Sequence, residues 1–316
     1  MRGYVLRRTL TTIPIIVLTT IVIFVLMRVL PGDPVLVLAG QSQASVSAQT
    51  LQQLRHQYGL DQPIPVQYGR WIAQIVSGDR GRSIQSDQPV LAVIKPALLP
   101  TVQIGLMALL LSLIIALPVG IISAVSPNSW KDLLGTLGAL VGAAVPYFLL
   151  AGALIYFVAL KLRWLPASGY VSPFTDPVQS WKSTILPAIT LGLGSAAVTT
   201  RQIRSSLLEV LRLGFITTAH AKGLRERQVI LRHALKNALL PVVTLLGIQV
   251  GLLLGGAVIT ETIFSIPGIG RLLVDSIFSR DYPVVQGIVL IISFTVIVAN
   301  FAVDLIYGYL DPRIRY

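Results

Sequence analysis

Long apolar runs separated by polar segments dominate the hydropathy pattern of this chain. The first run covers 9–30 and exceeds the roughly 20 residues that a helix needs to cross a bilayer. Five further apolar runs follow, approximately at 98–125, 133–160, 183–200, 239–259 and 284–306. The pattern predicts six transmembrane helices and an all-α integral membrane protein, because helices satisfy their own backbone hydrogen bonds in lipid.

The longest polar stretch, 31–97, predicts an extracytoplasmic segment between the first two transmembrane helices. It is rich in glutamine and serine, and its glycines and prolines divide it into short helices and turns. We therefore expect an N-terminal helix at 1–30, the extracytoplasmic segment at 31–97, and a five-helix core at 98–316. A basic loop at 205–240 interrupts this core.

Composition supports a membrane location and removes several classes of site. Of the 316 residues, 54% are hydrophobic and only 12% are charged, which is more apolar than a soluble domain covers with polar surface. The absence of cysteine excludes disulfides, thiolate metal sites and cysteine nucleophiles. Because His56, His220 and His233 have no carboxylates at ligand spacing, we predict no bound metal.

The formal net charge of +12 is better explained by membrane sidedness than by nucleic-acid binding. With six spans, more than half of the 25 lysines and arginines lie on the side that also holds both termini. The positive-inside rule therefore predicts that both termini are cytosolic. The run at 9–30 is interpreted as a retained helix, since it is longer than a signal-peptide core and no small-residue cleavage site follows it. The main basic cluster contains Arg201, Arg204, Arg212, Lys222, Arg225, Arg227, Arg232 and Lys236.

Motifs for catalysis and for nucleotide binding are absent from the sequence. It contains no Gly-x-x-x-x-Gly-Lys-Ser/Thr loop to hold phosphates and no Gly-x-Ser-x-Gly nucleophile elbow, so we predict neither a cofactor nor catalytic residues. The carboxylates of Asp33, Glu261 and Asp304 fall at or near span ends rather than at mid-depth. An ion-coupled secondary transporter usually needs such mid-depth groups, and it remains the second hypothesis because backbone carbonyls at a helix break can bind sodium.

The basic loop at 217–241 has a helical pattern. Leu224, Leu231 and Leu235 share one stripe of a helical wheel, and a stripe of basic residues lies beside it. Gly223 follows a short helical segment and predicts a left-handed turn between two short helices. Such an element can dock on a partner protein, and anionic lipid headgroups are the alternative partner.

Several ordered motifs give the chain a resemblance to a known family. The segment from Ala219 to Pro241 resembles the cytosolic Glu-Ala-Ala loop of ATP-binding-cassette (ABC) importer permeases, in the variant of the dipeptide and oligopeptide group. Some residues depart from the general pattern: Thr217 replaces its glutamate, Thr218 its next alanine, and Lys236 an expected proline. Gly214-Phe215 also replaces the acidic-aromatic pair expected before the loop. The other matching strings are Pro31-Gly-Asp-Pro34, Gly59-Leu-Asp-Gln-Pro63, Glu261-Thr-Ile-Phe-Ser-Ile-Pro-Gly-Ile-Gly270, Arg280-Asp-Tyr-Pro283 and Asp311-Pro-Arg313.

The resemblance implies a non-catalytic permease of the bacterial inner membrane that imports di- or oligopeptides, with glutathione or nickel complexes as alternative substrates. It also implies a second homologous permease, two ATP-binding subunits that bind ATP and magnesium, and an extracytoplasmic substrate-binding protein. A receptor or assembly scaffold is a third hypothesis. In a permease the basic loop would be the coupling helix docked on an ATPase subunit, through Ala219, Ala221, Lys222, Gly223, Leu224 and Arg225.

The segment after the fifth span has two interpretations. Its apolar residues alternate with turn formers, as expected for a short helix or a re-entrant turn. One interpretation is an outer mouth or a contact for the binding protein, formed by Glu261, Phe264, Pro267, Gly268 and Gly270. The other is a structural clamp between the fifth and sixth spans.

Overall fold

A computed structural model of the chain describes residues 2–29, 52, 56, 61–78 and 81–310. Over these residues the fold is helical, and the only β-type pairing is an isolated bridge between Arg82 and Pro89. The elements are α1 (Arg2–Val29), α4 (Ile64–Val76), α5 (Val90–Val125), α6 (Trp130–Ala144), α7 (Tyr147–Leu154), the π-helix η1 (Ile155–Lys161), α8 (Pro177–Leu211), α9 (Gly214–Ala221), α10 (Glu226–Gln228), the π-helix η2 (Val229–Ala234), α11 (Leu235–Ala238), α12 (Leu240–Ile263), α13 (Ile269–Phe278) and α14 (Tyr282–Leu310).

Four of the described helices, α5, α8, α12 and α14, are long and apolar enough to cross a membrane. A fifth span exists if α6 and the α7–η1 segment are taken together. The apolar part of α1 within the described residues, Thr9–Val25, is shorter than these helices. The all-α membrane architecture is therefore confirmed, whereas the count of six spans remains a prediction.

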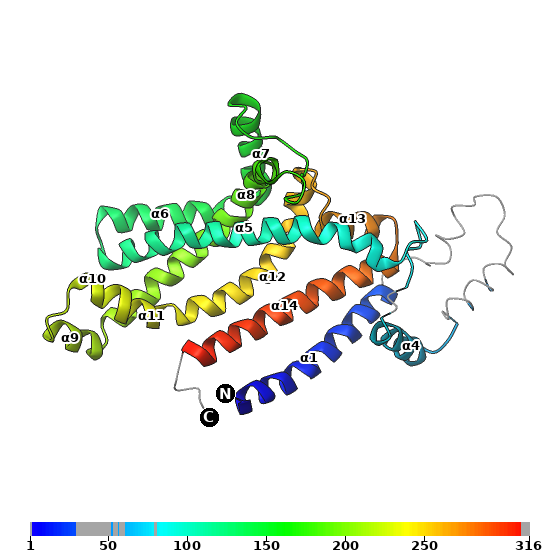
Figure 1. The fold of residues 1–316 in the computed structure, drawn as a ribbon, viewed down its shortest axis with the longest axis horizontal. Helices are drawn as coiled ribbons and strands as arrows, with labels where there is room; N and C mark the ends of the chain where they lie inside the picture. The colour runs from blue at the N-terminus through cyan, green and yellow to red at the C-terminus, as the bar shows by residue number, and fades with distance from the viewer. Residues whose placement is uncertain (1, 30–51, 53–55, 57–60, 79–80, 311–316) are drawn as a thin grey trace.

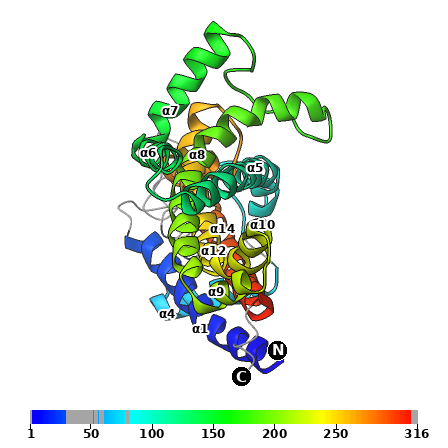
Figure 2. The same cartoon turned by 90° about the vertical axis from the view of Figure 1, so that its left-hand side faces the viewer.

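The third predicted span, at 133–160, is not one continuous helix. It breaks between α6 and α7, and the two parts are bent by 100°. Val145 is extended at φ −75° and ψ 120°, as expected for a residue before proline, and Pro146 has no N–H to continue the helix. Figures 1 and 2 show the consequence: α6 runs beside α5, while α7 rises away from the long helices.

The long helices run along one direction of the molecule; most of the short helices lie at its two ends, and α7 rises from its middle (Figure 1). At one end lie α9, α10 and α11, together with the start of α1 and the end of α14. We call this the α9 end. The opposite end holds α4 and α13, and we call it the α13 end.

Helix α8 is the central element of the bundle. In its most apolar stretch 72% of the residues are buried, against 28% for α5 and 33% for α12. This burial confirms that its small residues suit close helix packing. At Gly192, for example, an added Cβ would lie 2.9 Å from the carbonyl oxygen of Ala108 on α5. Glycine thus permits an approach of the two backbones that a larger residue would prevent.

Candidate functional site

The turn predicted at Gly223 is present and closes the C-terminus of α9. Gly223 has φ +72°, and its N–H donates to the carbonyl oxygen of His220 at 2.9 Å. The N–H of Leu224 reaches back to the carbonyl oxygen of Ala219 at 3.4 Å. These two bonds form a Schellman motif, in which the left-handed residue is usually glycine because it has no Cβ. The chain therefore leaves α9 through a well-defined reversal.

A side-chain contact also crosses this turn. Nε2 of His220 on α9 lies 2.8 Å from Oε2 of Glu226, the first residue of α10. Both side chains are exposed, so the pair adds little to stability. The contact links α9 to the start of α10 across the turn.

The six residues predicted for partner coupling face different directions. Ala221, Lys222, Gly223 and Arg225 are exposed at the tip of the turn, and Leu224 is partly buried. Ala219 is buried inside its own chain. The structure thus brings the six together on one turn, while only the exposed residues are available to another protein.

Ala219 belongs to an apolar cluster that mounts the turn on the bundle. We call this cluster the loop core; it joins α9 and the following short helices to α8 and to the last turn of α5. Because these elements share buried side chains, displacing α9 requires moving them too. The loop core consists of Ala124, Leu207, Val210, Ile216, Ala219, Val229, Ala234 and Ala238, with Leu224 packed against it.

The predicted leucine stripe of this loop is wrong, because the buried face of the helix contains other residues. Leu231 is exposed and Leu235 only partly buried, whereas Val229 and Ile230 are buried. The reason is that η2 is a π-helix, which needs more residues per turn than the α-helix assumed for the wheel. The buried face therefore moves to different positions along the sequence.

An ion pair that the sequence did not predict joins α6 to α8 at the α9 end. Asp132, in the first turn of α6, accepts from Nε of Arg204 at 2.6 Å and from Nη2 of the same guanidinium at 2.7 Å. The N–H of Asn128 also donates to Asp132, at 3.0 Å, and Ser129 caps the helix. The pattern Ser129-x-x-Asp132 is a helix-start signal, but nothing in the sequence indicates Arg204 as its partner.

This ion pair links the α5–α6 turn to α8, the helix that leads into α9. The paired oxygens and nitrogens form a bidentate contact, which is stronger and more directional than a single bond. Around Arg204 the surface is open: a cavity of about 430 Å³ is lined by Arg204, Ser205, Leu208, Glu209, Arg212 and Leu213.

The residues predicted for an outer mouth lie at the α13 end, and most of them are buried. Glu261, Phe264, Gly268 and Gly270 are buried, and Pro267 is exposed. Their direct contact with a binding protein stays a prediction. What the structure shows is a network inside this chain, centred on the carboxylate of Glu261.

Glu261 caps the N-terminus of α13 from the end of α12. Its carboxylate accepts from the Arg271 N–H at 2.9 Å and from the hydroxyl of Thr101 on α5. Thr101 in turn accepts from the Ile269 N–H at 2.8 Å. The free N–H groups of a helix start need such partners when buried. Gly268 makes room, because a Cβ there would overlap the Glu261 carboxyl group.

No group of three or more His, Asp or Glu side chains that could hold a metal occurs in the part of the chain that the structure describes. The described residues thus form a bundle of apolar helices with an exposed turn mounted on buried side chains at one end and a carboxylate-capped short helix at the other, as in a multi-pass membrane protein.

Residues 116–316 match the family described as binding-protein-dependent transport system inner membrane component, and residues 1–98 match the N-terminal model of the corresponding membrane component. The chain belongs to this family. It is 41% identical to a dipeptide transport system permease protein, DppB, of Alkalihalophilus pseudofirmus. It is 40% identical to a glutathione transport system permease protein, GsiC, of Escherichia coli K12. Each alignment covers 100% of this chain and 100% of the relative.

The fold is also similar to a solved membrane-protein structure. A chain of the MetNI methionine ABC transporter, in an inward-facing conformation, aligns with a TM-score of 0.59 and 18% identity. The alignment covers 70% of this chain and 97% of that chain. With the family match, this shows that the chain is a multi-pass permease subunit of an ABC importer of the inner membrane. Such an importer works with ATPase and substrate-binding partners.

Proposed function

We propose that the chain is the non-catalytic translocation subunit of an importer for di- and oligopeptides. The names of the similar relatives support this substrate class, since one is a dipeptide permease and another a glutathione permease. Glutathione is itself a tripeptide, so both names point to short peptides. Glutathione is the second candidate substrate because relatives of that name are almost as similar in sequence.

The proposed partners are a second homologous permease, two ATP-binding subunits that bind ATP and magnesium, and an extracytoplasmic binding protein. In this arrangement the α9 end is cytosolic, with both termini, and the α13 end faces outward. The basic cluster supports this orientation, because several of its members lie on the exposed surface at the α9 end.

Coupling to ATP hydrolysis is carried in this proposal by the exposed turn at Gly223. The observation that supports it is that the turn is exposed while its base is buried in the loop core. Ala221 and Gly223 let an ATPase subunit approach closely, and Lys222 and Arg225 offer charge to acidic groups there. Ala219 acts from inside, by fixing α9 to α8. Movement of the ATPase subunits then moves the bundle as packed elements.

Uptake by the reconstituted importer tests this function. We expect a labelled dipeptide to enter proteoliposomes only when ATP and the binding protein are both present. Competition with glutathione ranks the two candidate substrates. Uptake of glutathione without uptake of any dipeptide would favour the second candidate, and uptake of neither compound would contradict the proposal.

A further inference from the structure

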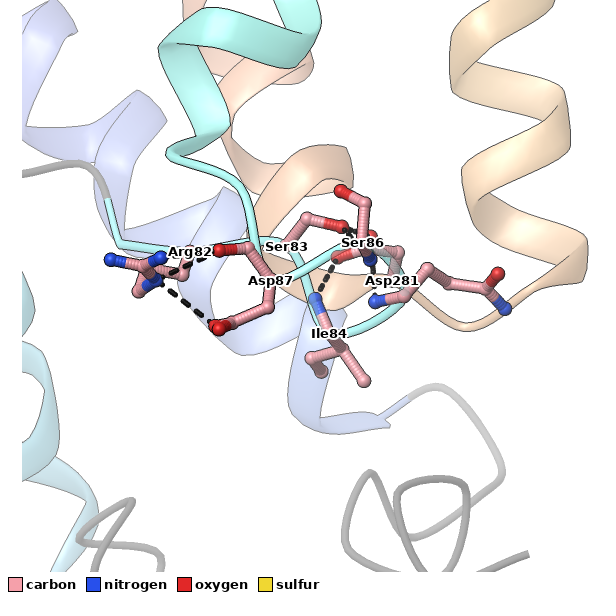
Figure 3. Close-up of polar contacts among 7 residues, drawn as sticks. Arg82, Ser83, Ile84, Ser86, Asp87 and Asp281 are labelled. Carbon is pink, nitrogen blue, oxygen red and sulfur yellow. Dashed lines mark hydrogen bonds and ion pairs between the residues drawn. The ribbon is translucent and has the colours of Figure 1, made fainter. Parts of the chain in front are cut away.

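Asp281, in the string Arg280-Asp-Tyr-Pro283, is a buried carboxylate between α13 and α14. Figure 3 shows it directed into a turn that lies far away in sequence. Its oxygens accept from the Ser83 hydroxyl, from the Ile84 N–H at 3.1 Å and from the Gln85 N–H at 3.4 Å. A buried carboxylate is unfavourable unless such donors surround it, so the contact is specific for this turn.

The turn that holds Asp281 has its own internal hydrogen bonds. We call residues 81–89 the Ser83 turn. The N–H of Ser83 donates to the carbonyl oxygen of Gln88 at 2.8 Å, and the N–H of Asp87 donates to that of Ser83 at 3.1 Å. On its surface, Nη2 of Arg82 donates to the Asp87 carbonyl oxygen at 2.6 Å (Figure 3). The turn is therefore a defined unit, and α5 begins directly after it.

An apolar cluster next to the Ser83 turn joins helices α5, α13 and α14. Val90 and Ile94 from α5 pack with Ile269 from α13 and with Val284 and Ile288 from α14. The approach of α14 to α5 is close at Gly287 on α14, where an added Cβ would lie 2.7 Å from Val90 Cγ1 and 3.0 Å from Ile94 Cδ1.

Helix α13 is thus fixed at both ends by carboxylates. Glu261, with Thr101 of α5, holds its N-terminus, and Asp281, with the Ser83 turn, holds the junction after its C-terminus. The ten residues of α13 span about 15 Å, so the two attachments are well separated. A rotation of α13 against α5 would leave at least one buried carboxylate without its donors.

We propose that the Ser83 turn, the first turns of α5, helix α13 and the start of α14 move as one rigid unit during transport, and that Asp281 is the positioning residue that joins the turn to this unit. We call it the α13 block, comprising 81–97, 269–278 and 281–288.

Because the chain contains no cysteine, one introduced pair can test the α13 block directly. Val90→Cys with Gly287→Cys places one thiol on α5 beside another on α14, at a site where a Cβ on residue 287 would lie 2.7 Å from Val90 Cγ1, which is close enough for a disulfide. We expect the oxidised importer to hydrolyse ATP and take up substrate at the rates of the reduced importer. Arrest by oxidation with recovery on reduction would overturn the α13 block, and failure of the pair to oxidise would contradict the close approach.

Asp281→Ala tests the positioning residue, with Gln88→Ala in the same turn as the control because the Gln88 side chain is exposed. We expect Asp281→Ala to lower ATP-driven uptake roughly tenfold while basal ATP hydrolysis is kept, the size of a typical coupling between distant sites. Oxidising the Val90→Cys/Gly287→Cys pair in the Asp281→Ala protein should restore uptake, since it replaces the lost tether. Normal uptake by Asp281→Ala, or a loss that the disulfide does not repair, would overturn the role of Asp281.

These measurements rest on the proposed peptide import only for the choice of substrate. If the unmodified importer takes up no peptide, the substrate class is wrong, and ATP hydrolysis by the oxidised and reduced complexes still tests the α13 block. If Asp281→Ala does not assemble, the disulfide in the protein that retains Asp281 gives the answer.

Discussion

Removing either partner of the Asp132–Arg204 ion pair should destabilise the α9 end of the bundle. The Asp132 side chain is only 6% exposed, so Arg204→Ala leaves a poorly hydrated carboxylate, whereas the Arg204 side chain is 30% exposed and lines an open cavity. Leaving a buried carboxylate without its charged partner costs about 3 kcal/mol, which we expect for Arg204→Ala. Asp132→Ala leaves a guanidinium that water still reaches, so its cost should be smaller, about 1–2 kcal/mol.

The assay is the free energy of unfolding in mixed detergent micelles, measured for both single variants and the double variant. The double-mutant cycle should give a coupling energy of about 2 kcal/mol, within the range for residues in direct contact. Arg201→Ala is the control, because Arg201 is an exposed arginine on the same helix. Its effect should stay within about 0.5 kcal/mol.

The same variants also test how tightly substrate uptake is coupled to ATP hydrolysis. If the ion pair transmits motion from α9 to the α5–α6 turn, both single variants should lower the ratio of uptake to ATP hydrolysis, and the exchange Asp132→Arg with Arg204→Asp should partly restore it. A coupling energy below about 0.5 kcal/mol would refute the reasoning, since the two side chains would then act independently.

Three further predictions concern the turn and the α13 end. Gly223→Ala puts a Cβ on a left-handed residue at a cost of about 1–2 kcal/mol, so uptake per ATP hydrolysed should fall. The control Gly214→Ala should not change this ratio, because no atom lies close to the added Cβ. Ala221→Arg should reduce co-purification of the ATPase subunits without changing the unfolding free energy, because Ala221 is exposed; an unchanged complex would remove it from the interface. Gly268→Ala should lower thermal stability of the purified protein, since the methyl group would displace Glu261; an unaffected midpoint would argue against the tight cap.

Some features of the candidate site were readable from short stretches of sequence. A glycine after a helical segment predicts a left-handed turn at Gly223, and the turn depends only on its neighbours. The sequence could not show that the Ala219 side chain points into the protein, because its burial depends on how α9 packs against α8. The leucine stripe failed for a related reason: the wheel assumed an α-helix, and the chain adopts a π-helix in η2.

Contacts between distant positions could not be predicted from the pattern. Asp132 and Arg204 are 72 positions apart, and Ser83 and Asp281 are 198 apart. Asp132, Arg204 and Asp281 are polar positions near the ends of apolar runs, and Ser83 lies within the polar stretch at 31–97. Only the relative depth and rotation of the helices decide which of them meet.

By itself, the sequence determined that the chain is a helical membrane protein with a basic turn on one side, because apolar length, charge bias and glycine preference act locally along the chain. Proline at position 146 breaks the helix locally, but the tertiary structure alone decided the burial of Glu261 and Asp281 and the division of the turn into an exposed tip and a buried base. Those outcomes depend on which buried donor or apolar surface each residue meets, and such neighbours are fixed only when the helices pack together.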